Sequence, residues 1–298
     1  MADPVLRFAV IGSPIDHSLS PDMHRAAFAA LDLRHVYEKI ETFPDDLPSR
    51  IAELKRGDFA GLNVTVPLKE KVLDLVDELS SSVKAIGAAN TLVRRGDGTI
   101  IAHNTDAPAL RQELEQIGDT AGLGPPRSGG QIEHATFRDR SVLVIGSGGA
   151  ARAAIVALAT LGTNRIIVRG RNLENAAKLA TIVPGITVDV EPLEAPKRER
   201  EDLAGIVQAT TCGMIGGPPG ELVASAVAWE SVPSDAVALD VVYRPRETVF
   251  LKTARARGLV CEDGLGMLAR QGALAFQLWL GIIPPLDEMK KALLARAN

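Results

Sequence analysis

Ten short runs of aliphatic and β-branched residues place the strongest constraint on how this chain can fold. The stretches between the runs carry apolar residues at helical spacing. Strands that alternate with helices form right-handed βαβ units, and strands buried in a parallel sheet read as continuous apolar runs. The pattern therefore predicts an α/β fold with a mostly parallel sheet. The runs are residues 8–11, 61–66, 91–94, 100–102, 141–145, 165–168, 187–190, 205–208, 237–241 and 259–261.

Length and composition indicate two domains. The chain has 298 residues, more than the roughly 100 to 200 of a typical domain, and 46% of them are hydrophobic, which leaves enough apolar surface for a core. The main break in composition lies between Gly118 and Asp139, where Gly, Pro and Ser are concentrated. This segment is predicted to be an exposed loop that leads into the second sheet.

Charge and cysteine content exclude several classes of partner. The formal net charge is −4, which gives no general attraction to nucleic acid or to an anionic membrane. Cys212 and Cys261 are the only cysteines, too few for a disulfide framework and without the paired spacing of a zinc site. No apolar run approaches the ~18 residues of a membrane span. We expect a cytoplasmic protein that binds a small molecule and no metal.

A glycine turn follows the run at 141–145. Gly146, Gly148 and Ala151 fit the pattern G-x-G-x-x-G/A, in which the glycines allow a tight turn and close approach to a pyrophosphate, and the small third residue allows close helix packing. Amides at the start of the following helix can bind phosphates. The pattern predicts dinucleotide binding, with a turn that serves packing alone as the alternative. The predicted contacts are Gly146, Ser147, Gly148, Gly149 and Ala150.

The end of the next predicted strand, at 165–168, indicates which cofactor is bound. A carboxylate there would bind the ribose 2′-hydroxyl of NAD and repel a 2′-phosphate. The chain instead has Arg169 and Arg171, and the first acidic residue is Glu174. Guanidinium groups suit a phosphate because they offer paired donors and stay charged. We predict NADP rather than NAD, unless both arginines are solvated surface residues.

Two serines stand near the start of a helix in the first third of the chain. Ser20 is predicted as its N-cap, with Pro21 at the first helical position. This local role explains Ser20 and Pro21 but not Ser18. The two hydroxyls and the free amides of the helix start would together bind a carboxylate.

A lysine follows the run at 61–66. Strand alternation places Asn63 and Thr65 on one face. Pro67 is predicted to end the strand and begin a helix, so that Lys69 falls in the first turn, where the helix dipole disfavours a cation. A residue that is locally unfavourable in this way is expected at a functional site. The alternative is that Lys69 is an ordinary surface lysine.

Polar residues also lie near the ends of two further runs. Asn90 precedes the run at 91–94, and Asp106 follows the run at 100–102. Open α/β sheets bind ligands at strand ends, although either residue could serve as a turn or cap residue, and capping by Asp106 is favoured by the nearby Pro108. A lysine, a carboxylate and neutral hydrogen-bonding groups are what a polyhydroxylated carboxylate substrate would need.

Taken together, seven separated motifs resemble those of the shikimate dehydrogenase family. That family reduces 3-dehydroshikimate to shikimate with NADP in chorismate and aromatic amino-acid biosynthesis. The motifs are Ser18-Leu-Ser20-Pro21, Asn63-Val-Thr65-Val-Pro-Leu-Lys69, Asn90-Thr91, Asn104-Thr105-Asp106, Gly146-Ser-Gly-Gly-Ala150, Asp240-Val-Val-Tyr243 and Gly264-Leu-Gly266-Met267-Leu-Ala-Arg-Gln271. The resemblance does not extend to the segment 118–136, which we interpret as an insertion relative to the family.

The resemblance implies a two-lobed α/β fold. Residues 1–105 and 264–298 would form a discontinuous substrate-binding domain, residues 106–263 an NADP-binding Rossmann domain, and the substrate would lie between the lobes. Lys69 and Asp106 would be the catalytic pair, and Ser18 and Ser20 would bind the substrate carboxylate. The implied contacts to ring hydroxyls or the pocket wall are Asn63, Thr65, Asn90, Thr105, Asp106, Tyr243 and Gln271. Further implied cofactor contacts are Asn172, Thr210, Met214, Val241, Gly264 and Met267.

Some residues depart from the family pattern. Gly170-Arg171-Asn172 keeps only the arginine of the usual Asn-Arg-Thr, Ala107 stands where glycine is usual, and Gln208 where asparagine is common. A quinate/shikimate dehydrogenase using NAD or NADP, a catalytically silent cofactor-sensing regulator and a folate dehydrogenase are the alternatives. The presence of Lys69 and Asp106 disfavours the silent regulator, and the two serines would be unexplained in a folate enzyme. A monomer and a homodimer are both compatible with the sequence.

Overall fold

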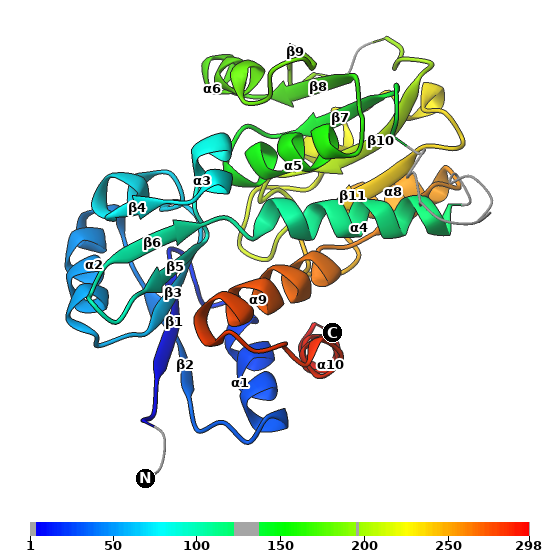
Figure 1. Ribbon diagram of the computed structural model, residues 1–298. Coiled ribbons are helices and arrows are strands. Elements are labelled where there is room, and N and C mark those ends of the chain that lie inside the picture. The colour runs from blue at the N-terminus through cyan, green and yellow to red at the C-terminus, as the bar shows by residue number, and fades with distance from the viewer. Residues whose placement is uncertain (1–3, 122–136, 195–196, 298) are drawn as a thin grey trace, which may run out of the picture. The chain divides into compact units, whose positions relative to one another are not determined.

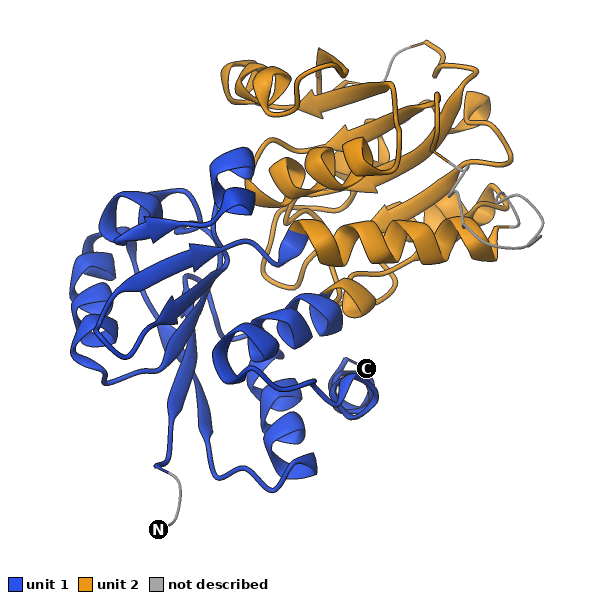
Figure 2. Cartoon of the chain, viewed as in Figure 1, with its two compact units in different colours: residues 1–106, 268–298 blue, residues 107–267 orange. Residues whose placement is uncertain are grey.

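The computed structural model describes residues 4–121, 137–194 and 197–297 and confirms the predicted α/β class (Figure 1). The chain divides into two units, each with its own six-stranded sheet. The first unit contains residues 1–106 and 268–298, and the second contains residues 107–267 (Figure 2). Most of the segment predicted as a loop, residues 122–136, lies outside the described residues.

The sheet of the first unit is mixed. Its strand order is β2-β1-β3-β5-β6-β4, in which β1 is parallel to β2 and β3, β5 is antiparallel to β3 and β6, and β4 is parallel to β6. Two of its strands are not evident from the sequence: β2, because charged residues interrupt it at the sheet edge, and β4, because it has only two residues. The strands are β1 (Arg7–Gly12), β2 (Val36–Glu41), β3 (Gly61–Val64), β4 (Glu78–Leu79), β5 (Thr91–Arg94) and β6 (Ile100–His103).

Helices cover both faces of this first sheet. Because strand side chains alternate between faces, Ala9 and Ile11 pack with Leu47 and Leu54 of α2 in one apolar cluster. On the other face, aromatic side chains from β1 and β2 pack against α1 and α9. The helices are α1 (Ser20–Ala30), η1 (Pro44–Asp46), α2 (Leu47–Arg56), η2 (Lys71–Leu75), α3 (Ser81–Ile86), α9 (Leu265–Leu280) and α10 (Leu286–Arg296).

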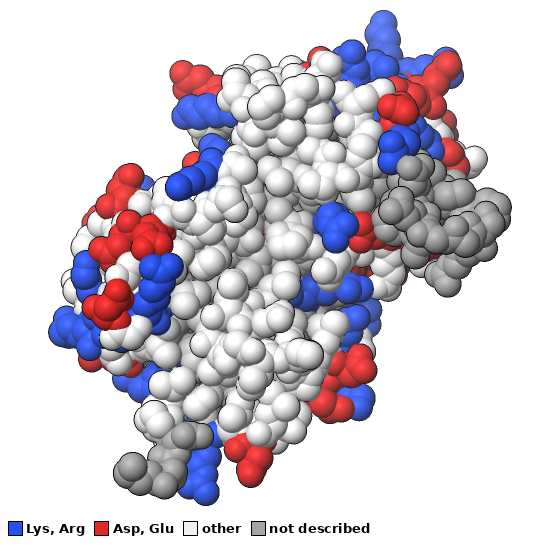
Figure 3. Space-filling model, viewed as in Figure 1, with Lys and Arg blue, Asp and Glu red and all other residues white. Residues whose placement is uncertain are grey.

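Charged side chains of both signs gather over α2 in Figure 3. The ion pairs Lys55–Asp77 at 2.9 Å and Arg56–Asp58 at 2.8 Å lie at this surface. Exposed pairs of this kind add little to stability, because water and salt screen them. They keep this part of the first unit hydrated, while the apolar face of α2 contributes to the core.

The sheet of the second unit is parallel throughout. Its order, β12-β11-β10-β7-β8-β9, is that of a Rossmann domain, in which the chain proceeds outward from β7 to β9 and then returns beside β7 as β10. Ligands of such sheets bind at the carboxyl ends of the strands where the order reverses. The strands are β7 (Ser141–Ile145), β8 (Arg165–Gly170), β9 (Thr187–Pro192), β10 (Leu203–Gln208), β11 (Val237–Asp240) and β12 (Val260–Glu262).

The chain passes between the two units inside helices. One passage lies between Asp106 and Ala107, at the start of α4, and the other between Met267 and Leu268, near the start of α9. Gly118 belongs to α4, so the predicted loop begins too early, because a glycine was given more weight than the helical pattern around it. The remaining helices are α4 (Asp106–Thr120), α5 (Gly149–Thr160), α6 (Leu173–Ala177), η3 (Lys178–Thr181), α7 (Glu221–Ala224), η4 (Trp229–Ser231) and α8 (Val249–Ala256).

Candidate active site

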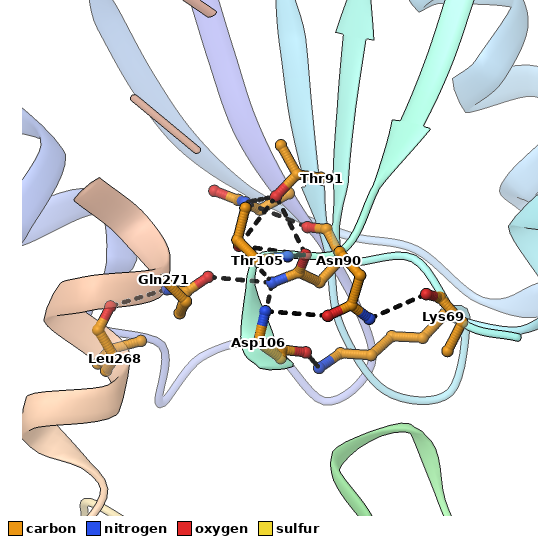
Figure 4. A network of polar contacts seen from close by, with 10 residues as sticks. Lys69, Asn90, Thr91, Thr105, Asp106, Leu268 and Gln271 are labelled. Carbon is orange, nitrogen blue, oxygen red and sulfur yellow. Dashed lines mark hydrogen bonds and ion pairs between the residues drawn. The ribbon is translucent and has the colours of Figure 1, made fainter. Parts of the chain in front are cut away.

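Asn90 lies at the centre of a buried polar network in the first unit (Figure 4). Its amide nitrogen donates to Thr105 Oγ1 and Asp106 Oδ1, both at 2.8 Å, and to Gln271 Oε1 at 3.3 Å. Its Oδ1 accepts from the backbone N–H of Thr105 at 2.8 Å and from the Thr91 hydroxyl at 3.2 Å. Full hydrogen bonding fixes the orientation of a buried amide. The structure thus brings Asn90, Thr105, Asp106 and Gln271 together.

Lys69 and Asp106 form the ion pair of this network. Lys69 Nζ lies 2.6 Å from Asp106 Oδ2, and the two side chains are only 15% and 4% exposed. The second carboxylate oxygen accepts from Asn90, so Asp106 is held in one orientation. Capping by Asp106 is not observed at the start of α4, where Asn104 Oδ1 accepts from the Asp106 N–H at 3.0 Å. An ammonium positioned by a carboxylate can stabilise and protonate an oxygen on which negative charge develops.

The backbone that carries Lys69 differs from the prediction. No α-helix begins at Pro67, because residues 66–70 form turns and bends, and the next element is the 3-10 helix η2. The helix-dipole argument for Lys69 is therefore wrong. The turn is held instead by the bond from the Leu68 N–H to the Thr65 carbonyl at 2.9 Å, and by that from the Ala89 N–H to the Lys69 carbonyl at 2.8 Å.

The two serines lie at the start of α1, although not in the predicted capping positions. The helix begins at Ser20, Leu19 occupies the N-cap position, and no side chain caps the helix. Ser18 Oγ accepts from the backbone N–H of Ser20 at 3.3 Å. Both serines are buried, and their placement beside the free amides of a helix start suits a carboxylate ligand.

Tyr37 is bonded to the network and is absent from the predicted site. Its hydroxyl donates to Asn63 Oδ1 at 2.6 Å. Asn63 Nδ2 donates in turn to the Asn90 carbonyl at 3.1 Å and to Thr91 Oγ1 at 3.2 Å. Asn63 therefore contacts protein groups through both ends of its amide. The alternation of residues 36–41 was the signal that could have revealed Tyr37 as an inward-facing residue.

His24 stacks on Tyr37 in the core of the first unit. The ring centroids are 4.3 Å apart with an interplanar angle of 9°. Neither ring nitrogen has a hydrogen-bond partner among the described residues, and burial lowers the pKa of His24 from 6.5 to about 3. His24 is thus neutral in the folded protein at ordinary pH.

Acid should destabilise the protein through His24. Because the folded-state pKa lies below the unfolded value, stability from the neutral ring is complete above about pH 6.5 and is lost as the pH falls toward 3. The expected slope is up to about 1.4 kcal/mol per pH unit. We expect His24→Phe to reduce the fall in unfolding free energy between pH 6.5 and 4, as measured by urea denaturation. Any change in packing that His24→Phe causes is independent of pH and would not alter that slope. Equal slopes in the wild type and in His24→Phe would contradict the prediction.

Two predicted substrate contacts remain, one in each unit. Thr65 is half-buried in the turn after β3, and its backbone N–H donates to the Ile11 carbonyl at 2.9 Å. Tyr243 is half-buried in the second unit, after β11. Their roles as substrate contacts stay predictions.

The glycine turn of the second unit has the geometry that a pyrophosphate requires. Gly146 has φ +122°, and a Cβ there would lie 2.9 Å from Thr210 Cγ2 and 3.0 Å from the Ala209 carbonyl oxygen, so a side chain does not fit. Gly148 precedes α5, and a Cβ there would have no atom within 4 Å, which leaves room for a ligand near the backbone. Ala151 is fully buried, as close helix packing requires. These residues fit a dinucleotide.

Arg169 is not placed to bind a phosphate, which corrects the prediction. It is 1% exposed and bonds to Glu191 at 2.7 Å, to Glu199 at 2.9 Å and to the Ala226 carbonyl at 2.7 Å. Burial lowers the pKa of Arg169, but the bonds to the two glutamates outweigh it and raise the pKa overall. Its donors are therefore engaged inside the unit. The acidic residue opposite it in β9, Glu191, was the available sequence signal.

Arg171 has the free guanidinium that a phosphate site requires. It is exposed after β8, and no hydrogen bond or ion pair engages it within the part of the chain that the structure describes. Asn172 caps α6, where its Oδ1 accepts from the Asn175 N–H at 2.9 Å. Of the predicted pair of arginines, Arg171 alone remains a candidate for the 2′-phosphate.

The segments after β10, β11 and β12 hold the other predicted cofactor contacts. Gln208 Nε2 donates to Asp240 Oδ1 and to the Cys212 carbonyl, both at 3.1 Å. Asp240 also accepts from Thr248 Oγ1 at 2.7 Å and from the Val242 N–H at 2.9 Å, and burial raises its pKa to about 7. These bonds fix the segments at the carboxyl ends of the two strands. The predicted contacts that lie there or in the following segments are Thr210, Met214, Val241, Gly264 and Met267.

The described residues contain neither a candidate metal cluster nor a candidate membrane-spanning helix. No group of three or more His, Cys, Asp or Glu residues in this part of the chain could hold a metal ion. Across the same residues, no helix has the length and apolar character to span a membrane.

A Rossmann sheet with a pyrophosphate turn, together with a buried lysine–carboxylate pair, defines an oxidoreductase that uses a nicotinamide dinucleotide. Comparison with known proteins identifies which one. The model of the shikimate dehydrogenase substrate binding domain matches residues 10–92, that of shikimate / quinate 5-dehydrogenase matches 130–212, and that of the shikimate 5′-dehydrogenase C-terminal domain matches 264–294. The chain belongs to the shikimate dehydrogenase family.

Individual relatives agree over nearly the whole chain. The shikimate dehydrogenase (NADP(+)) of Carboxydothermus hydrogenoformans is 39% identical over 284 residues, which cover 95% of each chain. The structure of shikimate 5-dehydrogenase from Thermus thermophilus with NADP(H) and shikimate has a TM-score of 0.76 and 38% identity, and the match covers 99% of this chain and 100% of that one. Quinate dehydrogenase from Corynebacterium glutamicum with NAD has a TM-score of 0.79 and 31% identity, with 98% and 99% covered.

Proposed function

We propose that the protein is an NADP-dependent shikimate dehydrogenase, which reversibly reduces 3-dehydroshikimate to shikimate. The observation that carries this proposal is the buried ion pair of Lys69 and Asp106 at 2.6 Å, attached to the Asn90 network. Family membership and the pyrophosphate turn support the choice of a nicotinamide dinucleotide.

Each residue has a defined part in the proposed reaction. NADPH, when bound, supplies the hydride that the carbonyl carbon of the substrate accepts. Lys69 Nζ stabilises the negative charge that develops on the carbonyl oxygen and gives it a proton, so that the carbonyl becomes a secondary alcohol. Asp106 holds Lys69 in place and accepts a hydrogen bond from a substrate hydroxyl. Ser18 and Ser20 bind the substrate carboxylate.

Steady-state kinetics with shikimate and with quinate, each against NADP and NAD, test this function. We expect the highest kcat/KM for shikimate with NADP. A higher value for quinate with NAD would instead indicate a quinate dehydrogenase. A cytoplasmic location and a monomeric or homodimeric state also stay proposals.

Arg171→Ala should weaken the preference for NADP. A charged hydrogen-bonded contact of the kind a guanidinium makes with phosphate contributes about 1.5 to 3 kcal/mol, so kcat/KM for NADP should fall roughly 10- to 100-fold while that for NAD stays near the wild-type value. The nearby exposed cation Lys178 provides a matched control, because Lys178→Ala should leave both values unchanged. An unaltered NADP-to-NAD ratio in Arg171→Ala would rule out the proposed phosphate contact.

A further inference from the structure

Gln208 is a fully buried polar residue at the carboxyl end of β10, and its side chain takes no part in the proposed reaction. Both ends of its amide are bonded to protein groups. Nε2 donates to the Cys212 carbonyl and to Asp240 Oδ1, both at 3.1 Å, and Oε1 accepts from the Thr210 N–H. Because a backbone N–H only donates and a carbonyl only accepts, these partners fix the orientation of the amide. Gln208 thus binds the backbone of the loop after β10 at two points.

Asp240 anchors the other side of this amide. It is fully buried at the end of β11. Its Oδ1 also accepts from the Val242 N–H at 2.9 Å, and its Oδ2 accepts from the Thr248 hydroxyl at 2.7 Å. Thr248 caps α8, where its Oγ1 accepts from the Leu251 N–H at 3.2 Å. The position of the Gln208 amide is therefore set by α8 and by the segment after β11 as well as by β10.

These segments lie on the side of the second sheet that suits the nicotinamide half of a dinucleotide. A Rossmann domain binds the two halves on opposite sides of the point where the strand order reverses. Arg171, the candidate for the 2′-phosphate of the adenosine half, follows β8 on one side of β7, whereas β10 and β11 lie on the other side. The loop after β10 also packs on the pyrophosphate turn, since a Cβ at Gly146 would lie 2.9 Å from Thr210 Cγ2. The nicotinamide half is therefore expected at the carboxyl ends of β10 and β11.

We infer that Gln208 is a positioning residue for the nicotinamide half of the cofactor. This inference rests on the proposed function. The side chain connects the loop that carries Thr210 and Met214 to the segment that begins at Val241, and both hold proposed cofactor contacts. The main-chain carbonyl of Gln208 adds to the connection, because it accepts from the Val241 N–H at 3.0 Å. Without the amide the two segments lose a shared support, whereas the adenosine half, on the other side of β7, does not.

Gln208→Met tests this role, because methionine keeps the length and approximate volume of the side chain and removes its hydrogen bonds. Calorimetry should compare NADP with adenosine 2′,5′-bisphosphate, which contains the adenosine half and its 2′-phosphate but no nicotinamide. We expect the Kd for NADP to rise roughly 5- to 30-fold, the effect of losing one or two hydrogen bonds, while the Kd for the bisphosphate stays within about 2-fold of the wild type. A purely structural role would not separate the two ligands.

Ser141→Ala is the matched control. Ser141 is fully buried at the amino end of β7, where its hydroxyl donates to Asp202 Oδ1 at 2.9 Å. The substitution therefore removes a buried hydrogen bond from the same sheet, at the end opposite the pyrophosphate turn. It should leave the Kd values for NADP and for the bisphosphate unchanged.

If Gln208→Met does not fold, as judged by circular dichroism, Gln208→Asn takes its place. Its amide is one methylene shorter and cannot reach both Cys212 and Asp240, so the Kd for NADP alone should rise by at least about 3-fold. Equal changes for NADP and the bisphosphate in the folded variant, or wild-type affinity for both, would overturn the positioning role alone. Failure of the wild-type protein to bind NADP and to oxidise shikimate would overturn both the proposed function and this inference.

Discussion

Lys69→Ala is expected to lower kcat for shikimate oxidation by at least about 100-fold, the lower range for removal of a general acid or base. In the proposed reduction Lys69 gives a proton to the substrate oxygen, so in the reverse oxidation it receives that proton. Its loss removes both this proton exchange and the charge that stabilises the substrate oxygen. Because chemistry and product release can both limit kcat, single-turnover measurement of NADPH formation gives the clearest value.

Lys69→Gln separates the chemical role of Lys69 from its structural role. Removal of one partner of a buried ion pair destabilises a protein, and Gln retains a hydrogen-bond donor that can reach Asp106. We expect Gln to restore stability relative to Ala without restoring turnover, because an amide group neither releases nor accepts a proton at ordinary pH. Lys71→Ala, at an exposed lysine two residues away, should be as active as the wild type. Turnover near the wild-type rate in either Lys69 variant would refute the role in proton transfer.

Arg169→Ala should lower the free energy of unfolding by about 3 to 5 kcal/mol, the range for loss of one partner of a buried ion pair. The Glu199 side chain is only 4% exposed and would be left as a buried charge without its partner. Glu199 Oε1 also accepts from the Ala228 N–H at 2.9 Å, so the segment around residues 226–228 would lose a second support. Urea denaturation followed by circular dichroism measures the change.

A double variant distinguishes loss of the Arg169 side chain from the charge left on Glu199. Arg169→Met with Glu199→Gln removes both buried charges and keeps an acceptor for Ala228, so it should recover most of the stability. Arg171→Ala should leave stability within about 0.5 kcal/mol of the wild type, as expected for an exposed residue. If Arg169→Ala lowered the free energy of unfolding by less than about 1 kcal/mol, the Arg169–Glu199 ion pair would contribute little to stability, and the prediction would be wrong.

The sequence predicts strands most successfully where both faces are buried. The run at 141–145 coincides with β7, whose residues are all buried, because a strand enclosed on both sides needs apolar residues at nearly every position. The strand β2 has the burial pattern of an edge, with Tyr37 inward and charged residues outward. Such a segment carries too few apolar residues to be identified by that rule.

The same contrast applies to the site. Lys69, Asn90 and Asp106 could be found because polar residues near strand ends have few structural explanations. Alternation could have placed Tyr37 on the inward face, but its hydrogen bond could not be predicted, because its partner Asn63 lies on a different strand. Arg169 was assigned to a phosphate because its buried partner, Glu199, lies 30 residues further along the chain and no local pattern links the two.

The helix α9 sets the order in which the protein can be completed during synthesis. Residues 107–267 are contiguous and can fold as soon as they leave the ribosome. The first unit must wait for residues 268–298, because Gln271 bonds to Asn90 across 181 positions and Trp279 Nε1 donates to the Leu92 carbonyl across 187. Contacts of such long range form slowly, since the entropy of closing the loop must be lost first. The N-terminal strands therefore keep an unfinished apolar face until residues 268–298 have been made.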